Sequence, residues 1–174
     1  PATGSWTVSF WAYPTSTSGY NTLMYQGPND TSFSSVAWLG VHAGAWNLAV
    51  WPSSDVESGS ASTNTWYHLA LVRNGNVWTV YVDGVSTISF TQAITLDTTR
   101  WEFGAFSSSN TDPLSGRIAH IKRWDAALTQ AEILNERYLI RPVRTTDLAG
   151  WYPTLPGSGE RARDYSGLGR DFTE

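Results

Sequence analysis

The sequence contains no cysteine among its 174 residues. Disulfide bonds, thiol catalysis and cysteine-bound zinc are therefore excluded. Charged residues are also scarce, at 15% of the chain, where ~25% is usual, and the formal net charge is −4. Because a protein that binds the nucleic-acid backbone needs clustered Lys and Arg, this balance argues against a nucleic-acid partner.

Long apolar runs are missing as well. The most apolar stretch, 36–51, is interrupted by glycines and polar residues and is too short to cross a bilayer. The N-terminus has no basic run followed by an apolar segment, so no signal peptide is visible. These absences predict a soluble chain with no membrane insertion.

Tryptophan is the residue in excess, with ten copies beside eight Tyr and six Phe. Aromatic and β-branched residues favour strands, and Gly, Ser, Thr and Asn fill the segments between them. This composition is typical of many short strands joined by turns. We therefore expect an all-β fold in one domain.

The clearest strand signal lies in 66–90. Asn74-Gly75 is a favoured pair for a type I′ turn, in which both central residues need positive φ, and Asp83-Gly84 supplies a second tight turn. The segment is thus predicted to form a meander of three strands. Both faces of 66–73 are apolar, which predicts a central strand covered on both sides.

Other elements follow from alternation and helical spacing. Thr129 and Glu132 form a capping box before apolar residues at helical spacing, which predicts one short helix at 129–139. The segment 52–65 is Ser-rich and is expected to be a polar loop. Further strands are predicted at 6–13, 22–26, 36–42, 45–51, 101–106, 116–124 and 148–153.

Blocks at 6–14, 66–84, 103–104 and 116–133 carry a family resemblance. With them, the chain resembles a laminin-G type, pentraxin-related domain of the concanavalin A-like kind. The resemblance implies a two-sheet antiparallel jelly-roll sandwich over residues 1–156. A Gly-, Arg- and Asp-rich tail, 157–174, is expected to pack on this sandwich or extend from it. The resemblance also favours an extracellular, cell-surface or virion-surface location.

Catalysis is not expected. Glycosidases need two carboxyl groups about 5–9.5 Å apart, and catalytic relatives of this fold carry a Glu-x-Asp-x-Glu strand or a similar one. The nearest pattern here is Asp55-Val-Glu57, in the predicted polar loop. The histidines, His42, His68 and His120, are interpreted as structural.

Aromatic rings offer a binding surface, since sugar rings stack on flat apolar faces while polar groups orient them. The candidate ligand-binding residues are Tyr20, Asn21, Trp46, Asn47 and Trp51. Trp46 and Trp51 are five residues apart and so point to opposite faces of a regular strand.

Three other tryptophans are expected to be structural, and a few acidic and amide side chains are candidates for binding a metal ion. Trp11, Trp66 and Trp78 lie in matched strands and are assigned to the scaffold. The resemblance also allows one calcium ion, with Asp30, Asn110 and Asp112 as candidate oxygen donors.

The favoured hypothesis is a non-catalytic binding module for carbohydrate, with a glycan or a protein surface as its partner. The alternative is a structural or adhesive assembly protein, such as a viral decoration or tail component. In that case the tail 157–174 would join copies of the chain or attach it to a virion. A glycan-cleaving enzyme is the third hypothesis.

Overall fold

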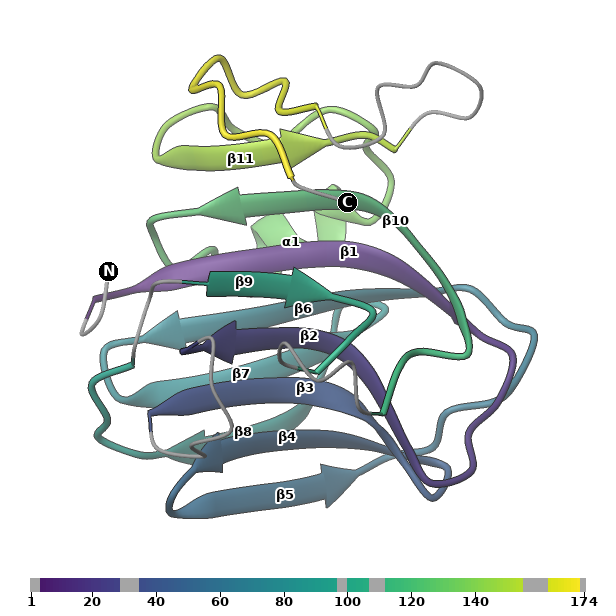
Figure 1. The fold of residues 1–174 in the computed structure, drawn as a ribbon. Coiled ribbons are helices and arrows are strands. Elements are labelled where there is room, and N and C mark those ends of the chain that lie inside the picture. Colours follow the sequence, from purple (N-terminus) through teal and green to yellow (C-terminus); the bar gives the residue numbers. More distant parts are fainter. Residues whose placement is uncertain (1–3, 29–34, 97–99, 107–111, 155–162, 173–174) are drawn as a thin grey trace.

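The computed structural model describes residues 4–28, 35–96, 100–106, 112–154 and 163–172. In this part of the chain, two antiparallel sheets pack face to face and one short helix lies outside them (Figure 1). The predicted two-sheet jelly-roll sandwich is confirmed.

One sheet has six strands, in the order β11-β10-β1-β6-β7-β8. The predicted meander is its β6-β7-β8 part. The strands are β1 (Trp6–Pro14), β6 (Tyr67–Asn74), β7 (Val77–Val82), β8 (Val85–Thr91), β10 (Gly116–Trp124) and β11 (Leu148–Tyr152).

The two turns of the meander differ in detail. Asn74 pairs with Val77, so the first turn is Gly75-Asn76 rather than Asn74-Gly75. Gly75 has a φ of 61° and Asn76 has no positive φ, which is the pattern of a type II′ turn, with glycine first. Asp83 and Gly84 both have positive φ, at 53° and 82°, as a type I′ turn requires.

The second sheet has five strands, in the order β5-β4-β3-β2-β9. Strand β5 lies inside the segment 52–65, where a loop was expected. That prediction was wrong because β5 is a polar edge strand: only Val56 packs on the core, while Asp55 and Glu57 are exposed. The strands are β2 (Tyr20–Gly27), β3 (Val36–His42), β4 (Ala45–Trp51), β5 (Ser54–Ser58) and β9 (Arg100–Phe103).

The main core lies between the two sheets and is rich in aromatic rings. Trp6 is fully buried and makes edge-to-face contacts with Trp78 at 5.7 Å and with Trp101 at 5.0 Å. Leu69 and Leu71 of β6 point into this core. Alternate residues of β1 also face it, which leaves Trp11 and Tyr13 on the outer side of the six-stranded sheet.

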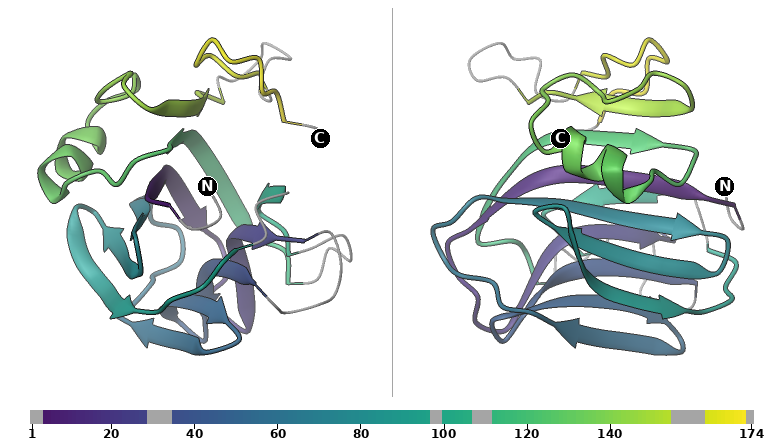
Figure 2. Two further views of the ribbon diagram at one scale, coloured as in Figure 1. Left: turned by 90° about the vertical axis from the view of Figure 1, so that its left-hand side faces the viewer. Right: turned by 180° about the vertical axis from the view of Figure 1, so that it is seen from behind.

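A second, smaller core lies on that outer side, beneath helix α1 (Gln130–Glu136). It contains Ala70 and Val72 of β6, packed with Ile133 of the helix. Figure 2 shows the helix against the six-stranded sheet, away from the other sheet. Strand β6 is therefore covered on both sides, and the capping box of Thr129 and Glu132 is present, both as predicted.

The helix ends at Glu136, three residues before its predicted end. The cause is a buried ion pair between Lys122 of β10 and Glu136. Lys122 Nζ also donates to the carbonyl oxygens of Leu139, at 2.7 Å, and Arg141, at 3.3 Å. Glu136 Oε2 accepts from the backbone N–H of Val143 at 2.7 Å. These bonds replace helical ones and hold the segment 137–143 against the sheet.

Candidate ligand-binding site

A pocket of about 400 Å³ lies on the outer face of the six-stranded sheet, between β1, β10 and the segment 137–143. This volume falls within the range of roughly 300–1,000 Å³ that is usual for ligand sites. We name it the Trp66 pocket. Its lining residues are Trp11, Trp66, Ala119, His120, Arg137, Tyr138, Leu139 and Ile140.

Neighbouring rings hold the two tryptophans of the Trp66 pocket in place. Trp11 makes an edge contact with the ring of His68, with centroids 5.5 Å apart. Trp66, which directly precedes β6, packs against Tyr13 at 5.3 Å and is still 40% exposed. Both rings thus present apolar surface without having to be ordered by a ligand.

The polar groups of the pocket carry little net charge. Arg137 pairs with Asp83, with Nε 3.3 Å from Oδ1, and its guanidinium lies over the ring of Tyr138. Burial, followed by the charge of Lys122, lowers the pKa of His120, so its ring is neutral at pH 7. A neutral imidazole offers one donor and one acceptor.

Strand β10 brings His120 into the pocket through an irregularity in its pairing. The register with β1 shifts between Ser9 and Trp11, and His120 there has a φ of 53°. Its backbone N–H donates to Thr154 Oγ1 at 3.1 Å instead of to the sheet. The Nδ1 atom of His120 is buried, and a hydrogen bond between the His120 ring and the backbone of Pro153 partly opposes the lowering of its pKa.

Three of the predicted ligand-binding residues lie on the outer face of the five-stranded sheet. Tyr20 is 48% exposed and stacks on His42 with centroids 3.9 Å apart, and His42 Nδ1 contacts Glu57. We name these three side chains the Tyr20 cluster. Asn47 is buried on the same face. Trp51 is 38% exposed and lies at the end of β4 that is farther from the Tyr20 cluster.

The other two predicted residues face inward or support a loop. Trp46 is 1% exposed and packs edge-on against Tyr67 at 4.9 Å, so its ring is not accessible to a ligand. As expected, it faces away from Trp51. Asn21 is buried, donates to the Ser18 carbonyl at 3.0 Å and accepts from the backbone N–H of Ser115 at 3.4 Å.

Asp55 and Glu57 lie in strand β5, two residues apart, and so point to the same outer face. Asp55 Oδ1 accepts from Asn47 Nδ2 at 2.7 Å, and Glu57 contacts His42. Both side chains are exposed. His68, in contrast, is 1% exposed, and burial, followed by the charges of Lys122 and Arg137, lowers its pKa to about 3.

The predicted calcium donors are only partly visible. Asp112 is exposed, has a φ of 49°, and its carbonyl accepts from the backbone N–H of Thr22 at 3.0 Å. Asp30 and Asn110 lie outside the described residues. Within the described ranges, no three His, Asp or Glu side chains are grouped so that they could hold a metal ion. None of the helices described there is long and apolar enough to span a membrane.

Sequence reasoning missed the Trp66 pocket because it assigned Trp11 and Trp66 to the scaffold. For Trp78, which is fully buried, the assignment was right. A strand pattern identifies the strand but not whether its end is covered. One signal was available: Tyr138, Leu139 and Ile140 are consecutive apolar residues after the helix, and all three are exposed.

A family model described as the concanavalin A-like lectin/glucanases superfamily matches residues 1–134. No curated protein matches the chain. Among solved structures, a candidate carbohydrate binding protein from Bacteroides ovatus is similar with a TM-score of 0.75 and 17% identity over 97% of this chain. The chain spans 50% of that protein's length.

Two further structures share the fold. The CBM40 of a Ruminococcus gnavus IT-sialidase has a TM-score of 0.65 and 16% identity, covering 77% of this chain and 83% of that one. A heptameric SAP-like pentraxin from Limulus polyphemus has a TM-score of 0.59 and 18% identity, covering 79% and 71%. Since the family model covers more than half of its residues, the chain belongs to the concanavalin A-like lectin/glucanases superfamily.

Proposed function

We propose that the chain is a non-catalytic carbohydrate-binding module and that the Trp66 pocket holds the sugar. The observation that carries the proposal is the pairing of two fixed tryptophan rings with neutral or charge-compensated polar groups in one cavity. The C–H faces of a sugar ring pack on such aromatic surfaces, and its hydroxyl groups need donors and acceptors that His120 and Arg137 supply.

The similar structures support this proposal at the level of fold. One is described as a candidate carbohydrate binding protein and another as a CBM40. Because one fold serves many functions, these likenesses raise the expectation but do not identify a site. The residues of the pocket are what tie the proposal to this chain.

The proposal contains no catalytic step. Among the described residues that line the pocket, none is Asp or Glu. Glycoside hydrolysis needs two carboxyl groups on either side of the scissile bond. The nearby carboxylate of Asp83 is paired with Arg137, and Asp55 and Glu57 lie on the other sheet.

A matched pair of tryptophan variants tests the proposal. Trp66 and Trp51 are 40% and 38% exposed, on opposite sheets, so Trp66→Ala and Trp51→Ala remove similar exposed surface. A glycan array first identifies a ligand for the unchanged chain, and calorimetry then measures both variants. We expect Trp66→Ala to weaken binding at least about tenfold, the equivalent of 1.4 kcal/mol, and Trp51→Ala to leave it unchanged.

Two outcomes would contradict the proposal in different ways. Loss of binding in Trp51→Ala but not in Trp66→Ala would move the site to the face of the Tyr20 cluster. Absence of binding across diverse glycans, with and without calcium, would refute the carbohydrate function itself.

A further inference from the structure

Two adjoining cavities lie along the side of the sandwich where β9 of one sheet faces β10 and β11 of the other. Their volumes are about 300 and 350 Å³, and they share Trp101, Phe103, Ile121 and Phe172. We name them together the Arg123 groove. Figure 1 shows β9, β10 and β11 on this side of the molecule. The groove has no lining residue in common with the Trp66 pocket.

Aromatic rings line the Arg123 groove, and the C-terminal segment 163–172 closes it. Phe172 packs on Tyr152 with centroids 3.9 Å apart and on Phe103 at 5.6 Å. Tyr152 donates its hydroxyl hydrogen to the carbonyl of Arg170 at 2.6 Å. This part of the predicted tail therefore folds back onto the chain's own sheet and supplies one wall of the groove.

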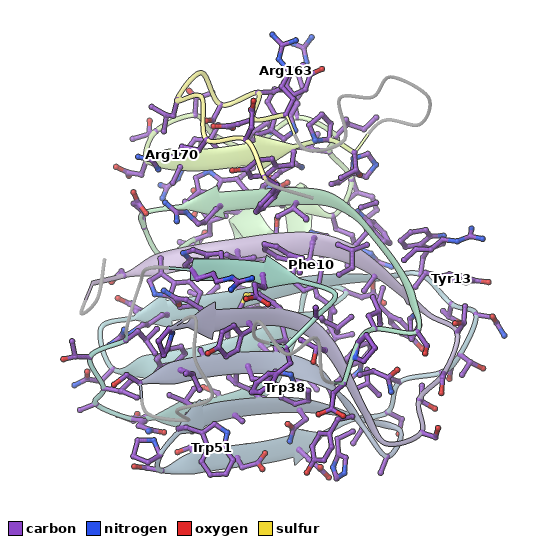
Figure 3. All side chains as sticks on the ribbon, in the orientation of Figure 1. Phe10, Tyr13, Trp38, Trp51, Arg163 and Arg170 are labelled. Carbon is purple, nitrogen blue, oxygen red and sulfur yellow. The ribbon has the colours of Figure 1, made fainter. Side chains whose placement is uncertain are left out.

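Asp164 fixes that wall. Its carboxylate accepts from the backbone N–H groups of Trp151 at 3.0 Å, Ser166 at 2.8 Å and Arg170 at 3.1 Å. Burial opposes the ionisation of Asp164, but these hydrogen bonds outweigh it and lower the pKa of the carboxyl group. The wall is thus preorganised, and Arg170 is held beside β11, as Figure 3 shows.

The charged groups of the groove leave one buried donor unused. The Arg123 guanidinium lies 5.3 Å above the Trp101 ring, and its Nη2 is 3.3 Å from Asp125 Oδ1. Its Nε is buried and has no acceptor among the described residues. Arg170 Nη1 donates to the Ala149 carbonyl at 3.1 Å.

Among the described residues, two carboxylates line the Arg123 groove, and both are already engaged. Glu102 lines the cavity of about 350 Å³ and pairs there with Arg100, while Asp171 lines the cavity of about 300 Å³ beside Arg123 and Arg170. Asp171 Oδ1 accepts from the backbone N–H of Asp164 at 2.7 Å. Two guanidinium groups, Arg123 and Arg170, therefore line this cavity against a single, hydrogen-bonded carboxylate. An anion placed there would give Arg123 Nε the acceptor that it lacks, and charge-assisted hydrogen bonds of this kind are the strong ones.

We propose that the Arg123 groove binds a carboxylate-bearing sugar ring, of the uronic acid class. The carboxylate bonds to Arg123, with Arg170 nearby, and the apolar face of the ring packs on Tyr152 and Phe172. The sugar part of this proposal rests on the proposed function, whereas the carboxylate part rests on the arginines alone. Both Arg123 and the one arginine of the Trp66 pocket, Arg137, pair with an aspartate, but Arg137 uses its Nε for that pair, whereas Arg123 uses Nη2 and keeps its Nε without an acceptor among the described residues.

Indole N–H signals in the NMR spectrum of the full chain can distinguish the two sites. The chain is titrated with trigalacturonate and, separately, with neutral galactotriose, and Trp66→Phe and Trp101→Phe assign the signals. We expect trigalacturonate to shift the Trp101 signal, and galactotriose to leave it in place. We also expect the affinity for trigalacturonate to fall as salt is raised, because the interaction is between charges.

Arg123→Gln should weaken trigalacturonate binding at least about tenfold. Arg117→Gln is the matched control, since it removes the same charge from an exposed position on the same strand and should change nothing. If Arg123→Gln lowers the melting temperature by more than about 5 °C, Arg170→Gln takes its place, with a loss of affinity expected again.

The outcomes separate this proposal from the proposed function. The proposal for the Arg123 groove is wrong if trigalacturonate shifts only the Trp66 signal, or if it binds Arg123→Gln as tightly as the unchanged chain. Either result leaves the proposal for the Trp66 pocket intact. A Trp101 shift that depends on Arg123, with no sugar shifting Trp66, supports the groove while counting against the pocket. Equal shifts of Trp101 with both sugars also overturn the carboxylate proposal.

Discussion

The outer faces of the two sheets both carry a partly exposed tryptophan. Only on the six-stranded sheet does a neighbouring segment, fixed by buried hydrogen bonds, lie beside that tryptophan and form a pocket with it. Trp66, on the six-stranded sheet, lies beside the segment 137–143, which Lys122 and Glu136 hold in place. Trp51, on the five-stranded sheet, lies at the end of β4. The comparison teaches that an exposed ring becomes part of a pocket when a neighbouring segment is fixed beside it.

The largest expected effect comes from the buried ion pair that fixes this segment. Lys122→Ala would leave Glu136 buried without its partner, and we expect a loss of about 3–5 kcal/mol in the free energy of unfolding, measured with urea. Glu57→Gln, in the exposed pair with His42 on the other face, is the control and should cost about 1 kcal/mol or less. Equal costs for the two variants would mean that the buried pair does not hold the segment.

The next effect is the dependence of stability on pH, through His68 beneath Trp11. Burial, with Lys122 and Arg137, lowers the pKa of His68 from 6.5 to about 3. The unfolded chain therefore binds a proton below pH 6.5 that the folded chain excludes. The contribution that neutral, buried His68 makes to the free energy of unfolding is complete above pH 6.5 and is lost as the pH falls toward 3.

Between pH 6.5 and 5 this loss amounts to about 1.5–2 kcal/mol, because the unfolded chain is half protonated at pH 6.5 and the slope then rises toward 1.36 kcal/mol per pH unit. Urea unfolding of the unchanged chain and of His68→Gln at both pH values isolates the contribution, because the other titrating groups are common to both. Identical pH slopes in the two proteins would show that His68 takes up a proton in the folded chain over the same pH range as in the unfolded chain, and would contradict the lowered pKa.

A smaller effect is expected at the rim of the Trp66 pocket. Tyr138 is 74% exposed, so Tyr138→Ala should change stability by less than about 0.5 kcal/mol while removing one aromatic wall. We expect the affinity for the glycan to fall about three- to tenfold by calorimetry, the equivalent of about 1 kcal/mol. Tyr20→Ala on the other face is the matched control, and an equal loss there would place ligand contacts on both sheets.

The sequence predicted the strands of the meander because alternation and glycine turns are local signals. It misplaced the first turn by one residue because the pairing of Asn74 with Val77 depends on register. It predicted too long a helix because Lys122, which is far away in the sequence, donates a hydrogen bond to the carbonyl of Leu139, just after the helix ends at Glu136. The pocket could not be predicted, since it forms where residues from β1, β10 and the segment 137–143 meet.

The smallest effect is expected from substituting the two carboxylates of β5. This substitution tests whether the outer faces of the two sheets differ in chemistry as well as in shape. Asp55 and Glu57 are exposed and engaged by Asn47 and His42, on the sheet opposite the Trp66 pocket. If they only serve an edge strand, the double variant Asp55→Asn, Glu57→Gln should alter stability by about 1 kcal/mol or less and leave glycan binding unchanged. Reducing ends measured over polysaccharides should stay at background for both proteins. A different result would be release of sugar by the unchanged chain and none by the double variant. Asp55 and Glu57 would then be the two carboxylates that glycoside hydrolysis requires, and the outer face of the five-stranded sheet would be a hydrolytic site.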